Sequence, residues 1–328
     1  MSDINNTQEQ AAVAAIKKKG QINFRQLGIL IVLAIMFVVF SIGSSYFLTV
    51  SNMISILQQA AIKGTIAIGM TLVIITAGID LSVGSITGLS AAVAATIMVK
   101  NGADGIPTAI AAAIAIGFIC GFINGELISR LKLQPFLVTM GTLSLYRGIE
   151  YIYTGAVTVR GLPPVFSTTM NAWNDKVPIP VIVMLIVLAV VYLVIKYTKW
   201  GRYVYAIGGN EEATRLSGVN VNRVRIATYT LMGVICAIAG ILYLGRIGSA
   251  DANTGTGYEM DAIAAAAIGG ASLAGGKGNL VGTILGAILL AALQNGLTLL
   301  KVQSFYQTAA TGLIIIIAVI IDRFTNRD

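Results

Sequence analysis

The 328-residue sequence contains no histidine and only two cysteines. Without histidine the chain lacks the commonest metal ligand and the side chain most often used as a general base. Cys120 and Cys236 both lie within apolar stretches, where a free cysteine behaves as a small packing residue, so we expect no disulfide. The sequence also shows no nucleophile–base pair and no cluster of metal ligands. We therefore expect a protein that is not an enzyme and that carries no metal and no cofactor.

Charged residues are scarce as well, at 11% of the chain against 56% hydrophobic residues. Soluble domains are about a quarter charged. Charge-free stretches such as 26–62, 278–300 and 302–321 match the roughly 20 apolar residues that cross a bilayer as a helix. They lack the alternation of β-strands, and backbone groups in lipid must be paired internally, so helices are favoured over a barrel. The composition predicts an all-α integral membrane protein in contact with lipid.

About ten transmembrane helices fit this pattern. They are 27–47, 54–78, 81–99, 105–127, 134–154, 178–197, 226–247, 258–274, 280–300 and 303–321. Together they form a single transmembrane domain over residues 27–322, between polar tails at 1–26 and 323–328. The eighth segment is short and carries Glu259 and Asp261 near its start, so full crossing and a broken helix are both open for 258–274.

The lysines and arginines predict the orientation of these helices. If the N-terminus is cytoplasmic, the cytoplasmic segments hold about three times as many lysines and arginines as the outer loops, as the positive-inside rule requires. Both termini then lie in the cytoplasm. The largest cytoplasmic loop is 198–225 and the longest outer loop is 155–177. This asymmetry accounts for the net charge of +8, and no nucleic-acid partner is needed to explain it.

Two glycine-rich stretches, "AGIDLSVGSITG" (77–88) and "GGASLAGGKGNLVG" (269–282), share a faint likeness. The second to fifth and the seventh to tenth helices would run in opposite directions, as do the inverted repeats of many transporters. A repeat and a chance likeness are both open on this pattern. The second stretch is not a phosphate-binding loop, because Ala271 and Gly278 stand where that motif needs glycine and serine or threonine.

Two spacings predict contacts. Gly117, Gly121 and Gly125 are four residues apart and share one helix face, and small faces let helix backbones approach closely in lipid. We expect this face to pack within the chain, with a subunit interface as the alternative. Arg147 and Glu150 are three apart and can form an ion pair on one helix face.

Four polar residues are our candidates for a translocation pathway: Asp80, Ser82, Asn124 and Asn295. Polar groups inside a membrane are costly, so they usually have a function. Asp80 has a structural alternative, because it stands just before a predicted helix and could cap the free N–H groups of that helix. Asn295 could equally tie two helices together.

The most polar run in the chain is "GGNEEATRLSG", residues 208–218. Asn210 is a suitable N-cap, and the acidic residues that follow it suit the positive end of a helix dipole. Gly218 is a suitable terminator. The run therefore predicts a short exposed helix in the cytoplasmic loop. It is either a solvated turn or, with Ala213 and Leu216 beside its charges, a helix that docks into a groove of a soluble partner.

Part of this run, "EATRLSG" (212–218), resembles the E-A-A-x-x-x-G loop by which permeases of ABC importers engage their ATPases. Thr214 replaces the second alanine, and the usual I-x-L-P downstream is absent. Four longer stretches resemble the permeases of bacterial ribose-type monosaccharide importers: 69–95, 201–221, 257–283 and 295–300. The resemblance runs from about residue 27 to the C-terminus, and residues 1–25 and 155–177 fit less well.

The resemblance implies a permease of the bacterial inner membrane with ten helices in two inverted halves. It implies three partners: a second copy of the chain in a homodimer, a cytoplasmic ABC ATPase subunit that hydrolyses ATP, and a periplasmic sugar-binding protein. Transport would occur by alternating access. It favours ribose, with galactose, xylose, fructose and arabinose still open. By motif position the ATPase-coupling residues are Gly209, Asn210, Glu211, Glu212, Ala213, Thr214, Arg215 and Gly218.

An ion-coupled secondary transporter that works without an ATPase is the alternative. Such carriers often hold carboxylates or histidines near the middle of the membrane. This chain has no histidine, and its carboxylates Asp80, Glu126, Glu150 and Asp261 lie near the ends of predicted helices. Both observations count against the alternative.

Overall fold

The computed structural model describes residues 24–171 and 178–325, and the fold is helical throughout these residues. Most of the predicted tail 1–26 and the end of the tail 323–328 lie outside the described residues. Within them, the only pairing of the β type is an isolated bridge between Val159 and Ala250. Both cysteines are buried and free, as expected.

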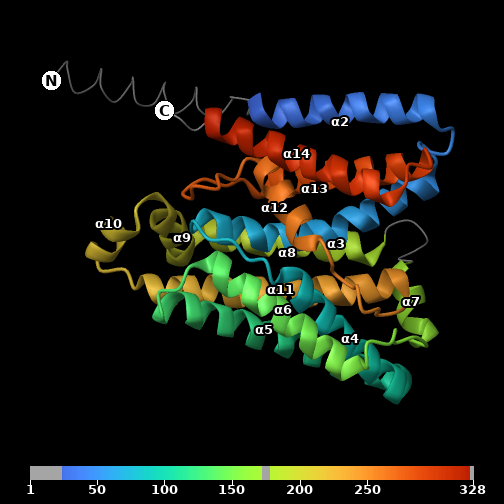
Figure 1. Cartoon of the computed structure of the whole chain (residues 1–328), viewed down its shortest axis with the longest axis horizontal. Helices are drawn as coiled ribbons and strands as arrows, with labels where there is room; N and C mark the ends of the chain where they lie inside the picture. The colour runs from blue at the N-terminus through green and yellow to red at the C-terminus, as the bar shows by residue number, and fades with distance from the viewer. Residues whose placement is uncertain (1–23, 172–177, 326–328) are drawn as a thin grey trace.

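Each of the ten predicted segments is helical over most of its length (Figure 1). The helices are α2 (Phe24–Gly43), α3 (Val50–Ile75), α4 (Val83–Asn101), α5 (Ile106–Arg130), α6 (Pro135–Thr154), α8 (Ile179–Tyr197), α11 (Val221–Ile247), α12 (Tyr258–Gly269), α13 (Leu280–Leu299) and α14 (Ser304–Thr325). Short helices lie between them: η1 (Gly102–Gly105), α7 (Pro164–Asn171), α9 (Lys199–Gly209) and α10 (Glu211–Leu216).

Within the described residues, five helical stretches are long and apolar enough to cross a membrane. They are Val50–Ile75, Val83–Arg130, Ile179–Tyr197, Val221–Ile247 and Leu280–Leu299. The second of these contains two helices, α4 and α5, which are joined through η1 and pack against each other. The fold is that of an integral membrane protein, and the count of ten spans stays a prediction.

Helix α12 favours the broken helix of the two alternatives that were open for the eighth segment. The helix was expected to reach residue 274 but ends at Gly269, and Gly270 follows with a φ of 104°. Its 12 residues rise about 18 Å at 1.5 Å per residue, which is well short of the roughly 30 Å of a bilayer core. The cause is the glycine pair at 269–270, because a left-handed glycine ends a helix and the chain then turns away.

Helices α3 and α11 form the centre of the molecule. The second half of α3 is almost entirely buried, and α11 packs against α3, α4 and α5. The contact between α5 and α11 is made through the predicted glycine face. A Cβ on Gly117 or Gly121 would overlap the carbonyl oxygen of Gly233 or Tyr229. The glycine face therefore packs within the chain, because only residues without side chains let the two backbones approach so closely.

The helix contacts of α3–α6 recur among α11–α14. Helix α3 packs against α13 as α11 packs against α5, and α4 packs against α11 as α12 packs against α3. The pairs α4–α5 and α4–α6 correspond in the same way to α12–α13 and α12–α14. Each helix of α3–α6 thus makes contacts that match those of its counterpart in α11–α14.

Figure 1 shows which elements share an end of the molecule. The short helices α9 and α10 lie at the left end, where α2 starts and α14 finishes, while α7 lies at the right end. The 198–225 loop and the ends of the described chain are therefore on one side, and α7, which belongs to the 155–177 loop, is on the other.

The glycine contact gives a stability prediction. We expect Gly121→Ala to lower the free energy of unfolding by about 1–3 kcal/mol, the usual cost of overpacking, because the new methyl group meets backbone atoms that cannot move independently. Gly28→Ala on α2 is the matched control, since nothing lies within 4 Å of its Cβ position. Reversible unfolding in mixed micelles measures both. Equal stability of the two variants would contradict the close contact.

Candidate functional site

The exposed helix α10 has the boundaries that the sequence predicted. The side chain of its N-cap, Asn210, accepts a hydrogen bond from the backbone N–H of Ala213 at 2.9 Å. Two acidic residues occupy its first turn. Gly218 follows the helix in the left-handed region with a φ of 84°. A capped start and a glycine end hold a six-residue helix that would be too short to persist alone in water.

The charges of α10 are paired rather than free. Arg215 donates two hydrogen bonds to the carboxylate of Glu212, one of them from Nε at 3.1 Å. These hydrogen bonds hold the pKa of Glu212 below its usual range, so the carboxylate stays ionised at neutral pH. Glu211 accepts from Arg225 at the start of α11 at 2.6 Å. One pair thus lies along α10, and the other fastens α10 to α11.

The exposed side of α10 differs from its inner side. Leu216 is 77% exposed, and Ala213, Glu212 and Arg215 are exposed beside it. Thr214 faces inward: it is 7% exposed, and its hydroxyl donates to the carbonyl of Asn210 at 2.7 Å. The position at which the sequence departs from the E-A-A-x-x-x-G motif is therefore on the inner side. The outer surface keeps an apolar residue among charges.

A glycine junction joins α9 and α10 to the rest of the fold. A Cβ on Gly208 would overlap the carbonyl oxygen of Ile75, at the end of α3, and the backbone nitrogen of Gly276. Gly276 in turn donates from its N–H to the same Ile75 carbonyl at 2.9 Å, and a Cβ on Gly275 would meet Ala77 and Gly208. The glycine run that resembled a phosphate-binding loop thus serves backbone packing.

Three of the four candidate pathway residues lie together. Asp80 Oδ1 accepts from the backbone N–H and the hydroxyl of Ser82 at 2.9 and 2.6 Å. Asn124 Nδ2 donates to the Ser82 hydroxyl at 2.8 Å, and the Tyr146 hydroxyl donates to Asn124 Oδ1 at 3.3 Å. All four side chains are buried. Asp80 therefore binds the residue that precedes α4, which agrees with its structural alternative.

Asn295 lies apart from this cluster. Its side-chain amide exchanges two hydrogen bonds with the amide of Asn52, each at 2.9 Å, so it ties α13 to the start of α3. Of the two alternatives for Asn295, this geometry favours the link between helices.

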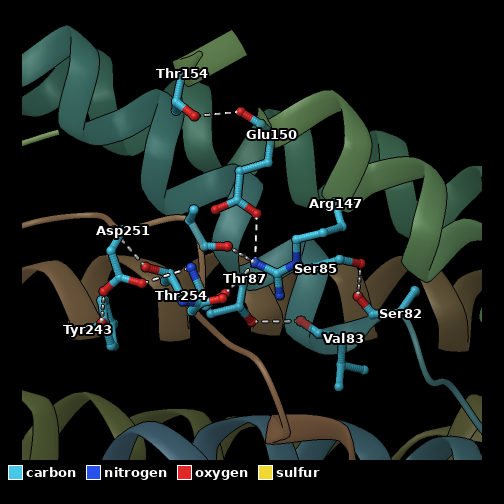
Figure 2. A network of polar contacts seen from close by, with 12 residues as sticks. Ser82, Val83, Ser85, Thr87, Arg147, Glu150, Thr154, Tyr243, Asp251 and Thr254 are labelled. Atoms are coloured by element: carbon cyan, nitrogen blue, oxygen red, sulfur yellow. Dashed lines mark hydrogen bonds and ion pairs between the residues drawn. The ribbon is translucent and has the colours of Figure 1, made fainter. Parts of the chain in front are cut away.

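The predicted pair of Arg147 and Glu150 is confirmed. Their closest atoms, Nη1 and Oε2, are 2.8 Å apart, and the side chains are 14% and 1% exposed. Arg147 also donates to the backbone carbonyls of Ala252 and Thr254 at 3.3 and 2.8 Å. Figure 2 shows Arg147 reaching from one helix to the loop that carries Asp251 and Thr254. The pair therefore fastens α6 to the segment that leads into α12.

A second buried ion pair was missed by the sequence reasoning. Lys63 Nζ lies 2.6 Å from Asp261 Oδ2 and also donates to Gln294 Oε1. Gln294 Nε2 lies 3.4 Å from Asp261 Oδ1, and the ammonium is 5.7 Å from the centre of the Tyr258 ring. This group lines a cavity of about 410 Å³. The available signal was Lys63 itself, an unpaired charge in the middle of a predicted span.

The chain is similar to known membrane permeases. Residues 52–321 match a family described as the permease component of the branched-chain amino acid transport system. The chain belongs to this permease family. It is 44% identical to the ribose import permease protein of Escherichia coli strain K12 over 306 residues, which cover 89% of this chain and 92% of that protein. The predicted resemblance to ribose-type permeases is thereby confirmed.

Other relatives of this permease carry different sugars in their names. The fructose import permease protein of Rhizobium meliloti is 37% identical over 310 residues, covering 91% of this chain and 85% of that protein. The galactose/methyl galactoside import permease protein of Escherichia coli strain K12 is 36% identical over 328 residues, covering 94% and 98%. No solved structure matches the chain.

The buried Arg147 pair yields a second prediction. We expect Arg147→Met to lower the free energy of unfolding by about 3–5 kcal/mol, because the buried Glu150 carboxylate loses its partner. Arg130→Met is the matched control: Arg130 also pairs with a glutamate on its own helix, but its side chain is 70% exposed, and such pairs contribute about 0–1 kcal/mol. Detergent unfolding curves compare the two. If the free energies of unfolding of the two variants differed by less than 1 kcal/mol, the Arg147–Glu150 pair would not be the buried link described above.

Proposed function

We propose that this permease is the transmembrane subunit of an ATP-driven ABC importer that moves a monosaccharide, with ribose as the first candidate, across the bacterial inner membrane. ATP hydrolysis takes place on a separate cytoplasmic ABC ATPase subunit. A periplasmic sugar-binding protein delivers the substrate, and two copies of the chain form a homodimer around the pathway. The sugar import relatives support the substrate class, and the ribose import permease supports the choice of ribose.

The observation that carries the proposal is helix α10. It is a capped, exposed helix with the sequence "EATRLSG", and it presents Leu216 among charged residues. Such a helix fits the helix-in-groove mode of protein recognition. In this proposal residues 209–218 form the coupling helix, and the ATPase contacts Gly209, Asn210, Glu211, Glu212, Ala213, Arg215 and Gly218, while Thr214 holds the helix from inside.

The proposed topology has ten transmembrane helices in two inverted halves with both termini in the cytoplasm. The recurring contacts of α3–α6 and α11–α14 support the inverted halves. The position of α10 at the same end as the start of α2 and the finish of α14 supports termini on the ATPase side (Figure 1). The excess of lysine and arginine in the same segments supports a cytoplasmic location for that side.

The way α10 is attached supports alternating access as the transport mechanism. When the ATPase subunits close, they displace α10 and α9, and the glycine junction passes this displacement to Ile75 of α3 and to the loop at Gly275 and Gly276. The two halves then tilt against each other. Asp80, Ser82 and Asn124, which join α5 to the start of α4, stay our pathway candidates at that joint, and Asn295 stays one on α13.

The coupling assignment gives a third prediction. We expect Glu212→Lys to reduce the amount of ATPase that copurifies with the tagged chain by about tenfold or more, which corresponds to about 1.4 kcal/mol of binding free energy. The substitution breaks the pair with Arg215 and reverses one charge on the exposed surface. The measurement is purification in mild detergent from the native host, followed by quantification of the bound ATPase and of sugar uptake.

Asp104→Lys is the matched control, because it reverses an exposed acidic residue in η1, between α4 and α5. This variant should keep the ATPase. If Glu212→Lys retained both ATPase and uptake, α10 would be a solvated turn. If the unmodified chain purified without any ATPase and its uptake were stopped by a protonophore, the secondary transporter would replace the importer.

A further inference from the structure

The cavity beside Lys63 is lined by several charged and hydroxyl-bearing side chains. Its polar lining comes from four helices: Lys63 on α3, Asp261 on α12, Gln294 on α13, and Thr308 and Thr311 on α14. Its volume of about 410 Å³ falls within the range of about 300–1,000 Å³ that small-molecule sites occupy. Charged and hydroxyl-bearing residues therefore converge on one space in a chain that is mostly apolar.

The charges in this cavity cancel each other. Lys63 and Asp261 form a close ion pair whose side chains are 16% and 10% exposed. A buried ion pair is costly compared with packed apolar side chains, so its presence within a membrane protein indicates a function. Because Asp261 already holds an ammonium group, it is a poor site for a transported cation, and the paired Lys63 is a poor site for an anion. The cavity suits a neutral ligand.

Hydrogen-bonding capacity remains after the pair has formed. An ammonium group has three donors, and Lys63 uses two of them on Asp261 and Gln294. The third has no hydrogen-bond partner among the described residues. The hydroxyls of Thr308 and Thr311 donate to carbonyls of their own helix at 3.1 and 3.0 Å. Each hydroxyl oxygen keeps lone pairs that can accept from a ligand hydroxyl.

The hydroxyls of α14 are arranged along one face. Ser304, Thr308 and Thr311 are spaced by four and three residues, so they stack along the side of α14 that lines the cavity. The ring of Tyr258 lines the same cavity from the first turn of α12. An aromatic ring with a few placed polar groups is typical of small-molecule sites, and it matches the apolar C–H face and hydroxyl rim of a sugar.

The position of the cavity suits a transport path. Lys63 is close to the midpoint of α3, which is one of the helices long enough to cross the membrane. Asp261 lies in the first turn of α12, the helix too short to cross alone. In transporters, substrate sites near the middle of the bilayer are commonly built from such discontinuous helices.

We propose that this cavity is a low-affinity subsite for a neutral, polyhydroxylated substrate, a monosaccharide, on its way through the protein. The inference rests on the proposed function for the class of substrate. Lys63, Asp261 and Gln294 offer a fixed set of donors and acceptors with no net charge, and the α14 hydroxyls exchange hydrogen bonds with the passing sugar. A small number of hydrogen bonds to a ligand without charge keeps the binding weak enough for release.

The test removes hydroxyls without changing side-chain volume. We expect Thr308→Val combined with Thr311→Val to lower the uptake of radiolabelled D-ribose per ATP hydrolysed by about fivefold in proteoliposomes that hold the complete importer. Thr96→Val on α4 is the matched control, because its hydroxyl also donates to a carbonyl four residues earlier and lies outside the cavity lining. This control should transport normally, and copurified ATPase should be unchanged in all variants.

A second variant addresses the ion pair. Lys63→Gln combined with Asp261→Asn removes both charges together, so no buried charge is left unpaired, and we expect the same loss of uptake. A binding readout is independent of ATP: modification of Thr311→Cys by a small thiol reagent should slow at least twofold with millimolar D-ribose, while modification of Thr96→Cys should not. The native cysteines are buried.

The outcomes separate this inference from the proposed function. Normal uptake in both cavity variants, together with unprotected Thr311→Cys, would overturn the subsite while the importer stands. Loss of the ATPase from the unmodified complex, or uptake that needs no ATP, would overturn the importer. Protection of Thr311→Cys by D-ribose would still support the subsite in that case.

Discussion

Helices α5 and α11 meet backbone to backbone through glycines, and the rest of the structure depends on this contact. In lipid, helices gain little from burying apolar side chains, so close packing of their backbones supplies the stabilisation. Gly117 and Gly121 let α11 approach, and Gly282 and Gly286 give α13 the same access to α12. Because these main-chain contacts fix the framework of helices, the few buried polar residues can serve to link particular segments to one another.

The two buried ion pairs both contact one segment, residues 250–261. Arg147 holds its backbone from α6, and Lys63 holds Asp261 from α3. Both anchoring helices belong to the first group of four, whereas the segment leads into α12 of the second. The ion pairs therefore join the two groups where the short helix begins. The cavity of the proposed subsite lies at this junction and is lined by residues of both groups, so a sugar bound there would contact both.

Local signals in the sequence were sufficient for the helices, the capping by Asn210, the turn at Gly218, and the Arg147–Glu150 pair, because each depends on residues a few positions apart. The end of α12 was missed because the glycine pair at 269–270 sits inside an apolar run. The Lys63–Asp261 pair was missed because its members are far apart in the sequence and meet only when α3 and α12 pack. Rules based on sequence spacing cannot predict such long-range contacts. The cluster of Asp80, Ser82 and Asn124 likewise forms only when the helices pack together.

The glycine junction at Gly208 and the exposed surface of α10 are built from different parts of the chain. The joint between α9, the end of α3 and the Gly275–Gly276 turn is made of main-chain atoms, whereas the exposed surface of α10 is made of side chains. In the proposed importer, substitutions at Glu212, Arg215 or Leu216 would change which partner is recognised but leave the main-chain junction unaltered. In the proposed importer, a duplicate of this chain would acquire a different ATPase by changing a handful of surface residues, while the main-chain contacts that link α10 to the other helices stay the same.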